Sequence, residues 1–577
     1  MINKFKRLTL WMLLLLGFQV SSFGQLKLDP VTTTYALTNV NIITKPGEKI
    51  ESATVVIKDG LIHAAGKNVS IPANAKVIKA DSMYVYAGFI DGLSHTGVAK
   101  PEKKDQPKIK NPGDANYEQS GIQPHLQVRN SISVKEKSIA NMRKLGFTAA
   151  HVVPHGKMFP GSGAFVVLDG KVADDMIVKE NVSLYSQLKG AGRYYPNTVI
   201  GVLSRWKEVY KQAEQAKSHE RAYRNNPNGR TRPNKDRVLQ AFYPAIDNQQ
   251  PVYFKATNVK DIYRIFTLQK ELGFPLVLTD VKQGFAVADK IKNNNQTVFI
   301  TLDLPKSKDK KKAKKSDKKD EKEEASKKEM TPKEKEKEAL KARQERALKA
   351  HLSQAALFQD KGIKFGFSMV SGKSKDFKAN VRKLMEHGLK EETALAALTT
   401  VPAQHFGVSQ MMGTVEKGKM ANLIVTDKPY FDEKSNVHYV FVDGNMHKYD
   451  VKKAKAKKKK GNAKDGESSG KAAAVAGVWS YTVAVPGQES TGKITIKKDG
   501  DDYSGFMVSD DDEDQEETPI ENIAVDGNKL TFSATVDGGG QELALEFDLT
   551  VDGESLEGSV SVGTFGSFEV TGSKDPK

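Results

Sequence analysis

The chain has 577 residues, 38% of them hydrophobic, which is enough for several domains and a sizeable core. It contains no Cys, so disulfides, thiolate nucleophiles and Cys-ligated metal centres are excluded. The formal net charge is +18, but the basic runs are Lys mixed with Glu and lack interleaved aromatic residues. We therefore expect no nucleic-acid partner, because nucleic-acid binding favours Arg-rich patches with aromatic side chains.

The N-terminal segment has the three regions of a secretory signal peptide. Lys4, Lys6 and Arg7 precede an apolar stretch over 8–20, and Ser22 and Gly24 supply the small residues of a cleavage site. The apolar stretch is shorter than the roughly 20 residues that a membrane-spanning helix needs. The sequence therefore predicts that residues 1–24 are removed. We expect a periplasmic or secreted mature chain without a transmembrane anchor.

Two segments far apart in the sequence have the alternating pattern of short strands. One covers residues 34–87, and the other covers residues 411–450. Because they flank a long central region, they predict one split β-sandwich domain assembled from both flanks.

The central region, residues 88–410, alternates apolar strands with helices, which is typical of an α/β fold. Its length fits a (β/α)8 TIM barrel with insertions. The strands are expected at 89–91, 147–153, 252–256, 276–280, 298–304 and 363–369, and helices at 134–145, 260–272 and 381–387. Residues 161–170 are interpreted as part of a hairpin, because no Lys follows Gly161-Ser162-Gly163 at phosphate-loop spacing.

Two further segments have strongly biased composition. The insertion 306–338 is rich in Lys and Glu and is predicted to be disordered, with helix-forming composition after Pro332. Residues 451–474 form a basic linker. Beyond it, residues 475–577 are acidic, with regularly spaced Asp-Gly turn signals that predict an all-β antiparallel barrel. We interpret this last domain as a binding or packing module.

Two motifs at opposite ends of the central region resemble those of the amidohydrolase superfamily. AGFIDGLSH over 87–95 resembles the P-G-F-I-D-x-H-x-H start of the family's barrel, and GTVEKGKMANL over 413–423 resembles its G-x-I-x-x-G-K-x-A-D-L strand and turn. The resemblance covers residues 34–450 and includes imidazolonepropionase-like metal-dependent hydrolases. It implies a hydrolase acting on C–N bonds, with one or two divalent metals held by His, Lys or Glu, and Asp at the C-terminal ends of the barrel strands.

The sequence departs from that ligand set at several positions. Leu93 stands at the first His of the H-x-H motif, and an isobutyl group has no lone pair for a metal. Only His95 remains, and the predicted strands at 276–280, 298–304 and 363–369 carry neither the expected His nor the expected final Asp. We therefore expect that Zn or another divalent metal is not bound tightly, and we assign no catalytic residue.

Four other side chains are candidates for a non-standard metal site with His95. His151 and His155 lie four residues apart around the end of a predicted strand, so on an extended chain they would share a face. Lys255 and Asp280 stand at the ends of two further predicted strands. Pro154 favours a loop near the two histidines, which would instead leave them solvated.

Three functions are compatible with these patterns. The favoured prediction is a pseudoenzyme: an exported amidohydrolase-fold protein that binds a small-molecule or peptide ligand, or an active amidohydrolase partner. The alternative is a metal-dependent hydrolase of peptide or non-peptide C–N bonds with a reduced or non-standard metal site. A third interpretation gives the main role to the acidic C-terminal domain as a surface-binding module.

Overall fold

The computed structural model describes residues 34–101, 110–305, 332–449 and 475–575, the last range with short gaps at 486–487, 500–501, 511–516, 527, 538–541 and 563–565. The predicted signal peptide and basic linker lie outside the described residues, as does the part of the predicted insertion before Pro332. The chain forms two compact units, residues 1–453 and residues 454–577, and each is described by itself.

The two flanks of the central region form one continuous eight-stranded sheet in the order β16-β15-β14-β5-β1-β2-β3, with β4 paired to β1. Its strands are β1 (Tyr35–Lys45), β2 (Glu48–Lys58), β3 (Leu61–Gly66), β4 (Lys76–Lys79), β5 (Tyr84–Ala87), β14 (Leu423–Thr426), β15 (Val437–Val442) and β16 (Asn445–Lys448). The flanks join where β5 pairs antiparallel with β14, with Ala87 opposite Leu423. Leu37, Val55 and Phe441 belong to the apolar core of this sheet.

The central region forms a barrel of eight strands in sequence order. They are β6 (Phe89–Ser94), β7 (Phe147–Val152), β8 (Gly161–Val167), β9 (Ile177–Gln187), β10 (Val252–Lys255), β11 (Leu276–Val281), β12 (Val298–Thr301) and β13 (Phe365–Ser368). The first and last strands meet where the Met369 amide and the Ser368 hydroxyl donate to the Leu93 carbonyl, at 3.2 and 3.1 Å. The TIM-like barrel is confirmed, and the six strands predicted from the sequence are all present.

One strand differs from the regular parallel pattern. β8 runs antiparallel to both β7 and β9, whereas the other neighbouring pairs are parallel. The cause is the short connection from 153 to 160, because a parallel crossover needs about a dozen residues or more. The hairpin expected around 161–170 is therefore the β7–β8 pair, and β9 is a strand that the sequence pattern did not reveal.

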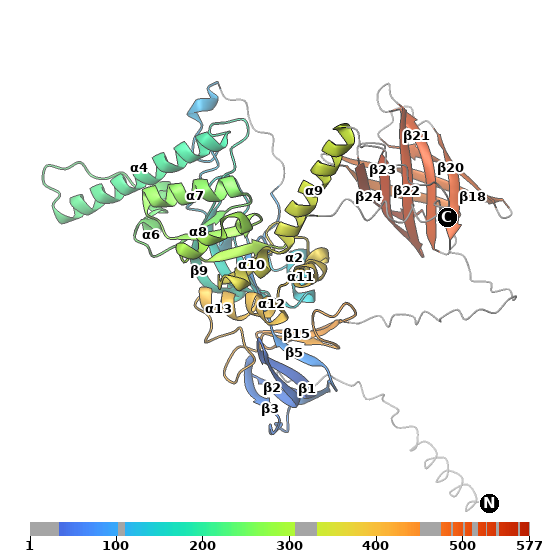
Figure 1. The fold of residues 1–577 in the computed structure, drawn as a ribbon, viewed down its shortest axis with the longest axis horizontal. Helices are drawn as coiled ribbons and strands as arrows, with labels where there is room; N and C mark the ends of the chain where they lie inside the picture. Colours follow the sequence, from blue (N-terminus) through green and yellow to red (C-terminus); the bar gives the residue numbers. More distant parts are fainter. Residues whose placement is uncertain are drawn as a thin grey trace, which may run out of the picture. The chain divides into compact units, whose positions relative to one another are not determined.

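Helices surround the barrel strands (Figure 1). They are α2 (Lys137–Lys144), α3 (Ala173–Met176), α4 (Val199–Asn225), α5 (Arg237–Gln240), α6 (Tyr243–Ile246), α7 (Val259–Leu272), α8 (Ala288–Asn293), α9 (Pro332–Leu352), α10 (Gln354–Asp360), α11 (Phe377–Glu386), α12 (Glu391–Leu398) and α13 (Thr400–His405). α7 shows why these segments are helical: Asn258 caps its first turn by accepting from the Asp261 amide, and Gly273 ends it in the left-handed region. α9 makes residues 332–338 helical at the end of the segment predicted to be disordered.

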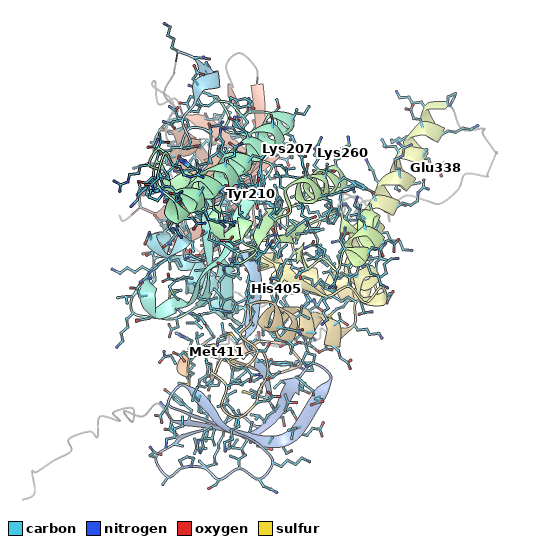
Figure 2. All side chains as sticks on the ribbon, turned by 90° about the vertical axis from the view of Figure 1, so that its left-hand side faces the viewer. Lys207, Tyr210, Lys260, Glu338, His405 and Met411 are labelled. Carbon is cyan, nitrogen blue, oxygen red and sulfur yellow. The ribbon has the colours of Figure 1, made fainter. Side chains whose placement is uncertain are left out.

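Aromatic side chains fill the barrel and close its N-terminal end. Gly92 and Gly366 leave room for the ring of Phe299, since a Cβ at Gly92 would lie 2.0 Å from Cδ1 of that ring. α13 brings His405 and Phe406 to this end, with His405 Nε2 2.5 Å from the Tyr253 hydroxyl. Figure 2 shows His405 between the barrel and the flank sheet. The opposite end, where the parallel strands finish, is the one that positions polar side chains.

The second unit is a closed antiparallel barrel, as predicted. Its strands are β17 (Gly477–Val485), β18 (Gln488–Asp499), β19 (Asp502–Ser509), β20 (Thr518–Asp526), β21 (Lys529–Asp537), β22 (Glu542–Asp552), β23 (Ser555–Val562) and β24 (Gly566–Lys574). Trp479, Phe532, Phe547 and Leu549 are buried in its apolar core.

None of the helices in the described part of the chain combines the length and the apolar character needed to cross a bilayer.

The packing of Phe299 predicts the effect of a single methyl group. We expect Gly92→Ala to lower the free energy of unfolding of the barrel by about 1–3 kcal/mol, because the new Cβ overlaps the ring. Urea titration of the purified chain measures the change. In a Phe299→Leu background the same substitution should cost clearly less, and an equal cost in both backgrounds would show that the ring is not the obstacle.

Candidate functional site

Two imidazole rings lie against each other at the C-terminal mouth of the barrel. His95 directly follows β6 and His155 lies in the connection from β7 to β8, and their ring centroids are 3.8 Å apart with 30° between the planes. His95 Nδ1 lies 2.8 Å from the Val153 carbonyl, which can only accept, so this nitrogen carries the proton and Nε2 keeps its lone pair. The structure therefore brings together two of the three predicted histidines.

Both rings are held neutral. The pKa of His95 is lowered to about 3. Burial is the largest cause, and His155, Lys255 and Lys189 act in the same direction, against the opposing hydrogen bond to Val153. Burial also lowers the pKa of His155, with help from the charges of two nearby lysines. At neutral pH neither imidazole contributes positive charge.

His151 occupies a different place. It lies on β7 in the barrel interior, with Nδ1 3.2 Å from the Gly92 carbonyl and Nε2 2.8 Å from the Ser183 hydroxyl. Its ring packs against Tyr253 and Phe406. The face shared with His155 does not form, because β7 ends at Val152 and the chain turns before His155. Both nitrogens of His151 are engaged away from the pair at the mouth.

Lys255, Asp280 and Ser371 form a closed polar triangle at the same end of the barrel. Lys255 Nζ lies 3.2 Å from Asp280 Oδ2 and donates to Ser371 Oγ at 2.8 Å, and Ser371 Oγ donates to Asp280 Oδ2 at 2.6 Å. Asp280 is fully buried at the end of β11 with a φ of 52°, a strained conformation of the kind that clusters at functional sites. Lys255 and Asp280 are among the predicted candidates, whereas Ser371 follows β13 in a loop that no motif marks.

Asp91 is a second buried carboxyl group that the sequence analysis did not single out. Its Oδ1 accepts from the amides of Met369 and Leu93 at 3.0 and 3.2 Å, and its Oδ2 is buried without a partner in the described part of the chain. Burial, the largest cause, and the charge of Asp280 together raise the pKa of Asp91 to about 8, against the opposing hydrogen bonds from the Met369 and Leu93 amides. Asp91 is therefore mostly protonated at neutral pH. The signal that could have found it is an Asp inside an otherwise apolar strand.

These side chains do not fit the metal centre that the resemblance implies. Leu93 is fully buried in the barrel core. Both nitrogens of His151 are engaged, and Asp280 Oδ2 already pairs with Lys255, whereas Asp280 Oδ1 is buried without a partner in the described part of the chain. No group of three or more His, Asp or Glu in the described ranges is placed to hold a metal ion.

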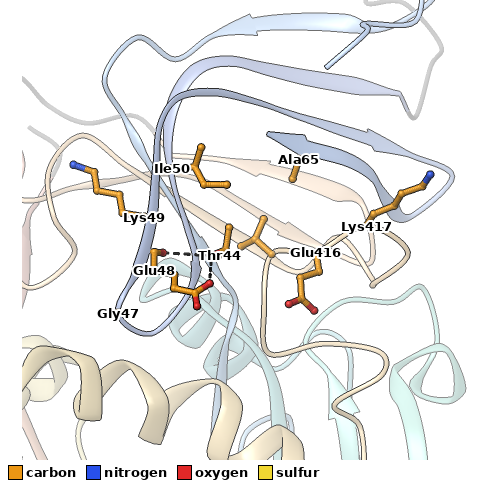
Figure 3. A pocket seen from close by; sticks show the side chains of 9 residues that line it. Thr44, Gly47, Glu48, Lys49, Ile50, Ala65, Glu416 and Lys417 are labelled. Carbon is orange, nitrogen blue, oxygen red and sulfur yellow. Dashed lines mark hydrogen bonds between the residues drawn. The ribbon is translucent and has the colours of Figure 1, made fainter. Parts of the chain in front are cut away.

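A separate hollow of about 660 Å³ lies on the flank sheet (Figure 3). Its charged lining residues include Glu48 and Glu416. Glu48 pairs with Lys45 at 2.7 Å, and Glu416 pairs with Lys419 at 2.9 Å. None of the residues proposed for the metal site lines this hollow.

Comparisons with known proteins agree with the fold. Residues 289–447 match the model of the amidohydrolase family. No curated protein matches the chain. Among solved structures, an amidohydrolase from Thermotoga maritima MSB8 is similar, with a TM-score of 0.56 at 17% identity, covering 71% of this chain and 99% of that one.

Two further structures match with TM-scores too low to support an argument. A putative prolidase from Bifidobacterium longum has 14% identity and a TM-score of 0.43, covering 72% of this chain and 95% of that one. A beta-aspartyl dipeptidase from Fervidobacterium islandicum AW-1 has 14% identity and a TM-score of 0.36, covering 72% of this chain and 96% of that one. The family match and the fold shared with the Thermotoga protein confirm the predicted resemblance to the amidohydrolase superfamily.

The raised pKa of Asp91 predicts a pH-dependent stability. Between the unfolded value of 3.8 and the folded value of about 8, the folded chain binds the extra proton, so its free energy of unfolding falls as pH rises through this window. We expect Asp91→Asn, which keeps the acceptor for both amides, to remove this slope. Since one pKa unit is worth about 1.4 kcal/mol, the variant should be more stable than the parent at pH 9 by several kcal/mol, and nearly equal at pH 4.

Urea midpoints at the two pH values measure the slope, with the exposed Asp360→Asn as the matched control. A slope that survives in Asp91→Asn would mean that Asp91 is ionised in the folded chain.

Proposed function

Taking the chain as a member of the amidohydrolase superfamily, we propose that it is a pseudoenzyme whose barrel binds but does not hydrolyse. The observation that carries the proposal is the Lys255–Asp280 ion pair at the mouth of the barrel, at 3.2 Å. Here a side-chain ammonium, in place of a metal ion, pairs with Oδ2 of the buried Asp280 carboxylate. The barrel thus keeps the fold of a hydrolase while its polar centre is already neutralised from within.

The chemistry of the family explains why this matters. A bound divalent metal lowers the pKa of water to make hydroxide, and it polarises the scissile carbonyl. Such an ion needs several lone pairs aimed at one point, and it is repelled by a fixed positive charge nearby. Lys255 Nζ is engaged with Asp280 and Ser371, and the isobutyl group of Leu93 has no lone pair, so neither side chain is suited to hold such an ion.

The residues at the mouth perform other tasks. Lys255 pairs with Asp280 and donates a hydrogen bond to Ser371, which in turn donates to Asp280, so the three side chains are fixed in one arrangement. Asp91 holds a proton inside the barrel, and His95, packed against the ring of His155, keeps Nε2 unprotonated. These are the features of a rigid polar surface suited to recognition.

The proposal includes export and a partner. Export is supported by the order of basic, apolar and small residues over 1–24. A partner amidohydrolase with an intact H-x-H motif would supply the hydrolysis that this barrel lacks. Pull-down of the mature chain from the exported fraction of its own cells should recover such an enzyme, and recovery of this chain from the cytoplasm with its first 24 residues intact would contradict export.

The alternative is a hydrolase with a metal at His95 and His155. It is favoured by one observation, the two neutral rings 3.8 Å apart, because unprotonated imidazoles can bind zinc. A metal at this position requires further ligands. The hydrolase would bind metal stoichiometrically, whereas the pseudoenzyme would not.

Metal content separates the two functions. The mature chain, incubated with excess Zn²⁺ and then gel-filtered, should retain well under one ion per chain by elemental analysis, with no change in His95→Ala. The partly exposed His387→Ala serves as the control for loss of an imidazole away from the mouth. One Zn²⁺ per chain, lost only in His95→Ala together with hydrolysis of dipeptides or cyclic amides, would establish the alternative.

A further inference from the structure

We propose that the mouth of the barrel binds a small anion carrying carboxylate or phosphate groups, through Lys100, Lys157, Lys189 and Lys255. The inference rests on the proposed function, because it requires that no metal occupies this end. It names the class of ligand that the altered mouth recognises.

The topology brings the four lysines to one arc of the barrel. Lys100 lies in the segment after β6, Lys157 in the connection from β7 to β8, and Lys189 just after β9, while Lys255 ends β10. These strands are neighbours in the order β6-β7-β8-β9-β10, and the parallel ones end on the same face. The lysines therefore follow the ends of β6, β7, β9 and β10, on both sides of the antiparallel β8, at the face where barrel enzymes bind their substrates.

The charges of these lysines lower the pKa values of the two histidines and of Lys189, as expected for groups at one end of the barrel. The charges of Lys100 and Lys189 act on His155, and those of Lys255 and Lys189 act on His95. Burial lowers the pKa of Lys189 first, and the charges of Lys157 and Lys255 lower it further. Each of these lysine charges lowers the pKa of its neighbour by repelling the protonated form. No carboxylate raises the pKa of His95, His155 or Lys189.

The carboxylates near this end are committed elsewhere. Asp280 pairs with Lys255, Asp303 with Lys282, and Asp261 with Arg264. In the described part of the chain, Lys100, Lys157 and Lys189 form no ion pair. Because Asp91 is mostly protonated at neutral pH, it does not compensate them either. An excess of positive charge thus remains around two neutral rings, and an anion would relieve the repulsion.

His95 adds a requirement beyond charge. Its Nδ1 is used by Val153, so Nε2 can accept a hydrogen bond but not donate one. A hydroxyl group beside a carboxylate would satisfy it. Malate, a hydroxy-dicarboxylate, and inorganic phosphate are therefore suitable probes for the two sources of anionic groups.

The test is calorimetric titration of malate and of phosphate into the full mature chain at low ionic strength, since salt screens exposed charges. We expect saturable one-site binding of at least one probe. Lys157→Gln and Lys189→Gln should each weaken it about tenfold, the loss of one hydrogen bond to a charged group. The tighter probe identifies the group, carboxylate or phosphate.

Two variants serve as controls. Lys364→Gln removes an exposed lysine just before β13, at the opposite end of the barrel, and should leave binding unchanged. Lys189→Arg keeps the charge and should retain binding. Absence of binding by both probes, or equal affinity in Lys189→Gln and the parent chain, would overturn the proposal.

Chelator treatment separates this inference from the proposed function. Binding that persists in metal-free protein supports the lysine site. Binding that requires Zn²⁺ and disappears with chelator would overturn both ideas, because the anion would then be bound by a metal. A metal-free chain that binds neither probe overturns the anion site alone.

Discussion

The ion pair between Lys255 and Asp280 is the interaction on which the polar end of the barrel depends. Asp280 is fully buried, and a buried carboxylate without a compensating charge is costly. Removing one partner of a buried pair typically costs about 3–5 kcal/mol. Lys255 supplies that charge from the neighbouring strand, since β10 and β11 pair in parallel, and Ser371 bonds to both side chains. The mouth of the barrel is therefore stabilised by a cation that belongs to the chain itself.

The apolar interior of the barrel and its polar C-terminal end are built from different residues. The barrel interior is filled by Phe299, Tyr253 and Phe406, whose rings pack against one another, and the ring of His151 packs against Tyr253. The C-terminal ends of barrel strands are where loop residues can change without loss of the fold. Here they carry the neutral rings of His95 and His155 and the ammonium group of Lys255.

Much of the fold follows from sequence patterns, because apolar strands and helices alternate clearly between 88 and 410. β9 escaped because its first half, starting at Ile177, is largely exposed and only its second half is buried. The antiparallel direction of β8 follows from the short connection over 153–160, which the pattern of apolar residues does not reveal. Lys255 and Asp280 were recognisable as residues at strand ends, but their pairing with Ser371 joins three segments and is set by packing. The position of the His151 side chain inside the barrel likewise depends on β7 ending at Val152, one residue after His151.

Crystals grown with excess Zn²⁺, measured for anomalous scattering at the zinc edge, test the central claim most directly. If the Lys255 ammonium holds the position, the density within hydrogen-bonding distance of both Asp280 and Ser371 will fit that side chain, and no anomalous peak will lie within bonding distance of Asp280 or His95. An anomalous peak bonded to either residue, with Lys255 displaced, would contradict the account.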